Sequence, residues 1–241
     1  MLPILVAALQ LCAVPVMAPG QPGAEDPDRL YADRVHLASA QRAAALWAER
    51  LTRDPGDFAA AWKLARAYYW LGGHVPDSAQ RSQLERGIDA GQRAVTLQPG
   101  RPEGHFWMAA NMGTLAEAGG LGQGLKYRGR IRDELQAVLR IDPSFQKGSA
   151  DRALGRWYLK VPGLFGGSKQ KSVEHLQRSL TYDPGSTASH YSLAETLDAM
   201  NRRAEARTEL QKVLDAPPNP EWAPEDEDFK QKARAMLART R

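Results

Sequence analysis

The segment from Pro55 to Tyr69, PGDFAAAWKLARAYY, is the most informative stretch of this 241-residue chain. It follows an Asp-Pro step, where a helix ends because proline disfavours the helical region for the residue before it. Downstream, Trp62, Ala65, Arg66 and Tyr69 have the spacing W-x2-L-G-x2-Y. Residues three and four positions apart share one face of a helix. The segment therefore predicts the end of one helix and the start of another that packs closely on a neighbour.

The same arrangement recurs on both sides of this segment. Each recurrence is marked by a proline after an apolar helical pattern: Pro55, Pro99, Pro143, Pro184 and Pro218. Mostly small or apolar residues occur twelve, eight and five positions before each proline, and these positions share one helical face. A second amphipathic pattern follows the prolines, for example Leu154, Gly155 and Tyr158 after Pro143. The chain thus reads as a series of paired helices.

These pairs resemble tetratricopeptide repeats, which are helical hairpins with a period of 34 residues. The resemblance implies an all-α solenoid with about four repeats, at residues 58–99, 101–143, 147–184 and 187–218, within a single domain of residues 25–241. The prolines are 44, 44, 41 and 34 residues apart, so three repeats carry surplus residues. We expect this surplus to form enlarged loops between the helices of a hairpin, at Leu71–Arg81, Gly119–Gly124 and Val161–Gly167. Two further surplus residues directly follow Pro143.

The two ends of the array have patterns of their own. Arg29–Arg53 predicts N-terminal helices with Trp47 turned inward. After Pro220, a segment with acidic residues at its start, basic residues at its end and one apolar face predicts a C-terminal capping helix.

Three segments carry a narrower resemblance: Gly104–Trp107, Gly155–Tyr158 and Pro162–Ser168. They look like the T-component family of TRAP transporters, and also like bacterial tetratricopeptide proteins of unassigned role. The resemblance covers roughly residues 42–218. It implies an exported protein that engages a periplasmic solute-binding protein, with a small apolar ligand as a further expectation.

The N-terminal segment Met1–Gly20 has no charged side chain and is rich in Leu, Val, Ile and Ala. Such a segment is typical of a signal sequence and predicts an exported, periplasmic or membrane-associated protein. No Lys or Arg precedes the apolar run, and Leu11 is large for a lipoprotein signal at Cys12, the chain's one cysteine. Lipidation of Cys12 and a retained membrane anchor stay open as alternatives.

Composition and motifs argue against several functions. Apolar residues make up 43% of the chain, charged residues 25%, and the net charge is +4, as in an ordinary globular protein. The histidines show no His-Glu-x-x-His spacing, and no Gly-x-Ser-x-Gly elbow occurs. The glycine-rich run before Lys126 lacks the Lys-Ser/Thr ending of a phosphate loop. We therefore predict no catalytic residue, metal or cofactor, and no nucleic-acid binding by the basic stretch Lys126–Arg132. His105 and His190 share one repeat position and are expected to pack between hairpins.

Solenoids usually bind on their concave wall, which the first helix of each repeat lines. The register places ten residues there: Lys63, Trp70, Phe106, Met112, Arg152, Arg156, Lys160, Tyr191, Glu195 and Asp198. For the aromatic residues the simpler interpretation is packing within the hairpins. The wall would suit another protein or peptide, or a small apolar ligand, and oligomerisation stays open. The sequence thus favours an exported interaction protein over a membrane-tethered or cytoplasmic assembly adaptor that binds no small ligand.

Overall fold

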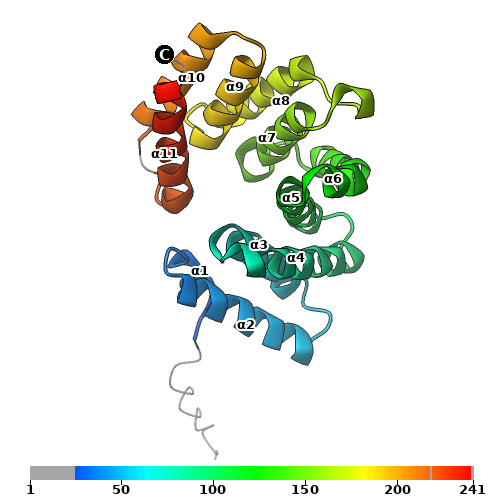
Figure 1. Ribbon diagram of the computed structural model, residues 1–241. Helices are drawn as coiled ribbons and strands as arrows, with labels where there is room; N and C mark the ends of the chain where they lie inside the picture. The colour runs from blue at the N-terminus through cyan, green and yellow to red at the C-terminus, as the bar shows by residue number, and fades with distance from the viewer. Residues whose placement is uncertain (1–24, 218, 240–241) are drawn as a thin grey trace, which may run out of the picture.

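The computed structural model describes residues 25–217 and 219–239. Within these residues the chain forms eleven α-helices, one 3-10 turn and no strand (Figure 1). The predicted signal sequence Met1–Gly20, Cys12 within it, and the fifth proline, Pro218, lie outside the described residues.

The helices follow one another as antiparallel pairs, which confirms the all-α hairpin architecture. The N-terminal pair and four hairpins comprise α1 (Pro27–Ala32) and α2 (Leu37–Arg53), α3 (Phe58–His74) and α4 (Asp77–Leu97), α5 (Pro102–Ala118) and α6 (Gly120–Ile141), α7 (Phe145–Lys160) and α8 (Lys169–Tyr182), and α9 (Thr187–Ala199) and α10 (Arg203–Asp215). A single helix, α11 (Ala223–Arg239), follows. Each predicted repeat spans one hairpin.

Two of the three expected loop enlargements are wrong. The surplus residues at Leu71–Arg81 extend α3 and α4, so that only Val75 and Pro76 separate these helices. The glycine-rich run Gly119–Gly124 is helical from Gly120 onward. Surplus residues inside a hairpin can lengthen both helices, because they continue its backbone hydrogen bonding and leave fewer groups to be satisfied elsewhere. Only the third segment, Val161–Gly167, forms a true loop, with the 3-10 turn Gly163–Phe165 inside it.

The surplus of two residues after Pro143 is accommodated by a left-handed turn of three residues at the start of α7. Gln146, Lys147 and Gly148 have φ values of 43°, 56° and 78°. A Cβ on Gly148 would lie 2.8 Å from Cδ2 of Tyr182, so a side chain here would be strained and would also clash with α8. The turn therefore absorbs the insertion and lets α7 begin in register with the other first helices.

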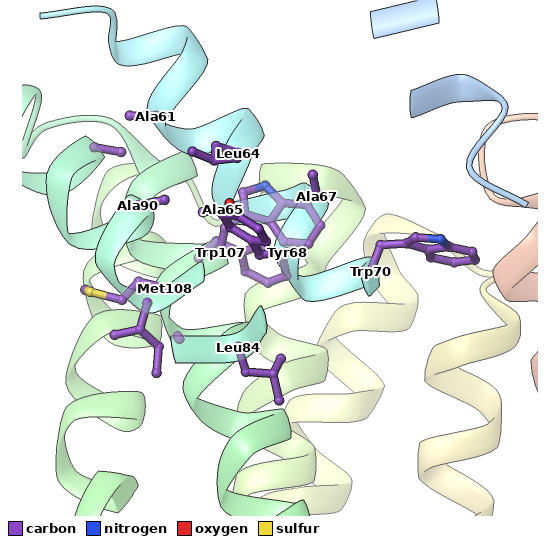
Figure 2. Close-up of a cluster of buried hydrophobic side chains, with 14 of the residues drawn as sticks. Ala61, Leu64, Ala65, Ala67, Tyr68, Trp70, Leu84, Ala90, Trp107 and Met108 are labelled. Carbon is purple, nitrogen blue, oxygen red and sulfur yellow. The ribbon is translucent and has the colours of Figure 1, made fainter. Parts of the chain in front are cut away.

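The core is formed where each first helix packs between its own partner and the next hairpin. Leu64 and Tyr68 of α3 belong to one buried cluster with Trp107 and Met108 of α5, and Figure 2 shows Tyr68 beside Trp107. Trp47 of α2 is fully buried as predicted. Small residues allow close approach of the helices. A Cβ on Gly91 of α4, for example, would lie 2.7 Å from Cβ of Met108.

The buried apolar residues form two clusters that divide at the third hairpin. One runs from Tyr31 to Trp157 and the other from Val173 to Met236. Within the second cluster, hydroxyl groups also pair between α8 and α9: Ser172 with Thr196 at 2.8 Å, and Ser179 with Ser189 at 2.9 Å.

The C-terminal helix α11 caps the array and also reaches back to its beginning (Figure 1). Phe229 of α11 packs on Tyr191 with ring centroids 5.6 Å apart, as expected for a capping helix. On its other side, Glu225 accepts hydrogen bonds from Arg34, which closely follows α1, with a shortest distance of 2.6 Å. Arg34 also donates to the carbonyl oxygen of Glu221 at 2.9 Å. The solenoid is therefore closed by contacts between the segment that follows its first helix and the N-terminal part of its last helix.

Candidate binding site on the inner wall

Three residues expected on the binding wall lie in the core instead. Met112 is fully buried, and Phe106 packs edge-on against Trp107 and Phe145. Trp70 is 5% exposed, and its Nε1 donates to the carbonyl oxygen of Arg34 at 3.0 Å. Their placement on the wall is wrong, because the first helix of a repeat is covered on two sides and its apolar face is wider than one stripe.

The charged residues of the third and fourth hairpins do come together. Arg156 of α7 donates to both carboxylate oxygens of Glu117 on α5, at 3.0 Å each. Its other terminal nitrogen is 3.4 Å from Glu195 on α9, which also lies 3.7 Å from Nζ of Lys160. Burial lowers the pKa of Arg156, but the two carboxylates outweigh this effect and the pKa is raised. This ion network joins three successive first helices across the inner wall.

Arg152 lies one turn before Arg156 on α7 and forms no ion pair with any residue that the structure describes. Burial lowers its pKa, and the nearby Tyr69 and Asp183 only partly offset this effect. Tyr69 of α3 is 38% exposed and stacks at a tilt on Trp107, with ring centroids 5.6 Å apart. A basic and an aromatic group thus stand near the middle of the wall. Lys63 is separate from them, since it pairs with Asp28 of α1 at 2.7 Å.

An open hollow of about 600 Å³ lies between α7, α9 and α11. Its lining combines apolar and charged residues: Leu159, Lys160, Tyr191, Glu195, Asp198, Ala199, Arg203, Met236 and Arg239. This volume is in the range of sites that hold a small ligand or a few side chains of a peptide. Four of the predicted wall residues, Lys160, Tyr191, Glu195 and Asp198, line it.

Several residues of this region were not predicted. Met236 and Arg239 belong to α11, which covers the hollow only because the array curves back on itself. Glu117 and Arg203 lie at helix ends. Glu117 and Glu195 are equally far from Arg156 in the sequence, and all three residues occupy the last turns of first helices. This regular spacing could have suggested the network.

The buried histidines stabilise individual hairpins. Nδ1 of His105 is 2.5 Å from Glu134 on α6, and Nε2 is 2.9 Å from the carbonyl oxygen of Pro99. His190 makes the same two contacts, with Glu209 at 2.5 Å and the carbonyl oxygen of Pro184 at 2.9 Å. Each histidine therefore links the two helices of its own hairpin to the preceding turn. The expectation that they pack between hairpins is corrected accordingly.

The third hairpin carries the same pair with its members exchanged. Here the acid, Asp151, is on the first helix and His175 is on the second, at 2.6 Å. In the first hairpin, the buried alanines Ala61 and Ala90 take the corresponding positions (Figure 2). The histidine–carboxylate pairs therefore stabilise the hairpins. In the described part of the chain, no group of three His, Cys, Asp or Glu residues could hold a metal ion. Nor is any described helix long and apolar enough to cross a membrane.

Stacked helical hairpins with a concave polar wall define a tetratricopeptide-like repeat protein, a class that generally mediates protein–protein interaction. A family model described as "Regulator of microtubule dynamics protein 1-3" matches residues 28–241, and the chain belongs to this family. A comparison with curated proteins found no match.

Solved structures support the fold. The thermophilic TPR protein TTC0263 from Thermus thermophilus is 21% identical, with a TM-score of 0.66 over 88% of this chain and 97% of that one. MamA is 17% identical, with a TM-score of 0.52 over 87% and 99%. MamA from Desulfovibrio magneticus RS-1 is 16% identical, with a TM-score of 0.52 over 80% and 97%. These identities show the shared fold alone.

Proposed function

We propose that this chain is an interaction protein that holds a segment of a partner polypeptide in the hollow between α7, α9 and α11. The observation that carries the proposal is the lining of this hollow, where charges of both signs surround Leu159, Tyr191 and Met236. Burial of a partner's apolar side chain would supply affinity, and the surrounding charges would select its neighbours. Glu195, which lines the hollow, is held by its contacts with Arg156 and Lys160, so this side chain is positioned before a partner arrives.

The cellular location of the protein and the identity of its partner are further parts of the proposal. The uncharged segment Met1–Gly20 supports export. The resemblance to the T-component family supports a periplasmic solute-binding protein as the partner, and a small apolar ligand as a second occupant of the hollow. Mass spectrometry of the native N-terminus tests export, because a cleaved chain would start downstream of residue 1. An intact N-terminus would favour the membrane-tethered or cytoplasmic adaptor.

A charge reversal in the hollow tests the binding site. We expect Asp198→Lys to weaken partner binding at least about tenfold, because a cation would replace an anion among the contacts of the partner. Asp133→Lys is the matched control, since Asp133 is exposed on α6 outside the hollow and pairs with the neighbouring Arg132. The measurement is affinity capture with the three proteins, followed by calorimetry with the purified partner.

The outcome is decisive in either direction. Loss of binding in Asp198→Lys with retention in Asp133→Lys supports the hollow. A partner that binds all three proteins equally would place recognition elsewhere. Because the family description refers to microtubule dynamics, tubulin is a second partner to test with the same variants, by co-sedimentation.

A further inference from the structure

The loop between α7 and α8 presents an apolar tip to solvent. In this loop, which we call the α7–α8 turn (Val161–Ser168), Leu164 is 88% exposed and Phe165 is 38% exposed. The turn extends beyond the ends of both helices (Figure 1). An exposed leucine at the end of a projecting turn contributes nothing to the core of the protein. Its side chain is free to enter an apolar environment outside the protein.

The turn is held in a fixed shape by its backbone. Phe165 donates to the carbonyl oxygen of Pro162 at 2.8 Å, and Ser168 donates to that of Tyr158 at 2.9 Å. Gly166 has a φ of 102°, and a Cβ on Gly167 would lie 1.7 Å from the carbonyl oxygen of Val161. The two glycines are therefore required for this conformation. Since the tip is already ordered, its insertion would need little further ordering.

Basic side chains with no ion pair among the described residues lie on the helices beside the tip. The guanidinium of Arg128 on α6 lies 5.3 Å from the ring centroid of Phe165. The backbone carbonyl oxygen of Arg128 accepts a hydrogen bond from Nε1 of Trp157 at 2.9 Å, which holds this part of α6 against the end of α7. Lys126 precedes Arg128 on α6, and Lys171 lies near the start of α8, with its Nζ 5.6 Å from the ring centroid of Tyr158. The neighbouring Lys169 instead donates from its Nζ to the carbonyl oxygen of Ala199. Lys126, Arg128 and Lys171 are therefore available to an external anion.

The sequence around the tip is also free of acidic residues. Residues 118–132 and 152–173 contain no Asp or Glu. An apolar tip that extends beyond a rim of cations fits the interface of an anionic membrane, where acyl chains lie beneath charged headgroups. Nucleic acid would use the cations but would leave the leucine in water.

We propose that the α7–α8 turn is a membrane-docking element that inserts Leu164 into the interface of an anionic lipid bilayer, while Lys126, Arg128 and Lys171 contact the headgroups. This surface is distinct from the hollow, so the chain could hold a partner while docked.

Vesicle flotation of the full chain tests this surface. We expect binding to phosphatidylcholine vesicles that contain phosphatidylserine, and about tenfold weaker binding for Leu164→Asp. Val35→Asp is the matched control, because Val35 is 65% exposed between α1 and α2, away from the α7–α8 turn, and should tolerate the change. High salt should weaken binding of the unmodified protein. Equal binding by Leu164→Asp and the unmodified protein would overturn the proposal, as would displacement from vesicles by an oligonucleotide.

A depth measurement separates the turn from any contribution of the N-terminal segment. In a Cys12→Ser background, an environment-sensitive fluorophore is attached to Leu164→Cys or to Val35→Cys. The emission should shift to the blue on anionic vesicles for position 164 and stay unchanged for position 35. No shift at position 164 on vesicles that carry the protein would show that another segment makes the contact.

Discussion

At the scale of single residues, the histidine–carboxylate pairs are the most repetitive feature of this protein. The sequence placed His105 and His190 in one repeat position, but it did not show their partners. Glu134 and Glu209 are recognisable only afterwards, since each lies nine residues before a proline, as does His175 in the exchanged pair. A buried pair of this kind satisfies polar groups that would otherwise be costly inside a hairpin.

The pair in the second hairpin predicts a pH dependence. The hydrogen bond to Glu134 raises the pKa of His105 above its ordinary value, although burial opposes the effect. A raised pKa in the folded state stabilises the fold below the unfolded pKa of about 6.5, and this contribution is lost as pH rises through the folded value. We expect Glu134→Gln to reduce the free energy of unfolding most at about pH 6 and least at about pH 9, as measured by urea denaturation.

The exposed Glu174→Gln provides the control for this experiment, because Glu174 accepts a hydrogen bond from Gln170 on the surface of α8. Its effect on the free energy of unfolding should be small and constant over the same range. A loss in Glu134→Gln that does not change with pH would show that protonation of His105 is not involved.

At the scale of helices and turns, the sequence predicted the pairing well and the lengths less well. Proline stops gave the ends of α2, α4, α6 and α8, because the residue before proline leaves the helical region. No comparable signal marks the ends between the two helices of a hairpin. The glycine-rich start of α6 resembled a loop in composition, but its backbone is helical. At the start of α6 only Gly120 has a positive φ, of 69°, whereas in the α7–α8 turn Gly166 has a φ of 102° and Gly167 lies too close to Val161 to carry a side chain.

Two glycines within helices should respond in opposite directions to the same change. Gly91→Ala would place a methyl group 2.7 Å from Cβ of Met108 and should lower the free energy of unfolding by about 1–3 kcal/mol. Gly113→Ala meets nothing within 4 Å and should raise it by about 0.5–1 kcal/mol through helix propensity. Chemical denaturation of both variants measures the difference. Equal effects would mean that α4 and α5 can move apart at no cost.

At the scale of the whole molecule, the curvature of the array decides which residues meet. Sequence register identified four residues of the hollow, because it follows α7 and α9. It could not identify Met236 or Arg239, since the position of α11 depends on the summed rotations of all four hairpins. It also placed Trp70 on the wall, although closure by Arg34 covers this side chain. Long-range geometry is therefore the part of the site that local patterns do not contain.

The closing contact can be tested by removing Arg34. Its side chain is 6% exposed, pairs with Glu225 at 2.6 Å and lies over the rings of Tyr31 and Trp70, 5.2 Å from each centroid. We expect Arg34→Ala to lower the free energy of unfolding by about 1–3 kcal/mol. The radius of gyration from small-angle X-ray scattering should increase as α11 separates from α1.

Arg81→Ala serves as the comparison, because Arg81 makes an exposed pair with Glu85 along one face of α4. Its effect should stay within about 0.5 kcal/mol, with an unchanged scattering profile. An unchanged profile for Arg34→Ala as well would show that hairpin packing alone fixes the curvature.

The contact between Arg34 and Glu225 joins positions that are 191 residues apart in the chain. In an open array, each unit touches only its neighbours, so the terminal units fray first and folding spreads from any local nucleus. Here neither end can fray without also releasing the other. Formation of the last contact requires closure of nearly the entire polypeptide, which raises the contact order and slows the final step of folding. The hairpins should consequently form fast and locally, and the contact between Arg34 and Glu225 should form in a late, cooperative step.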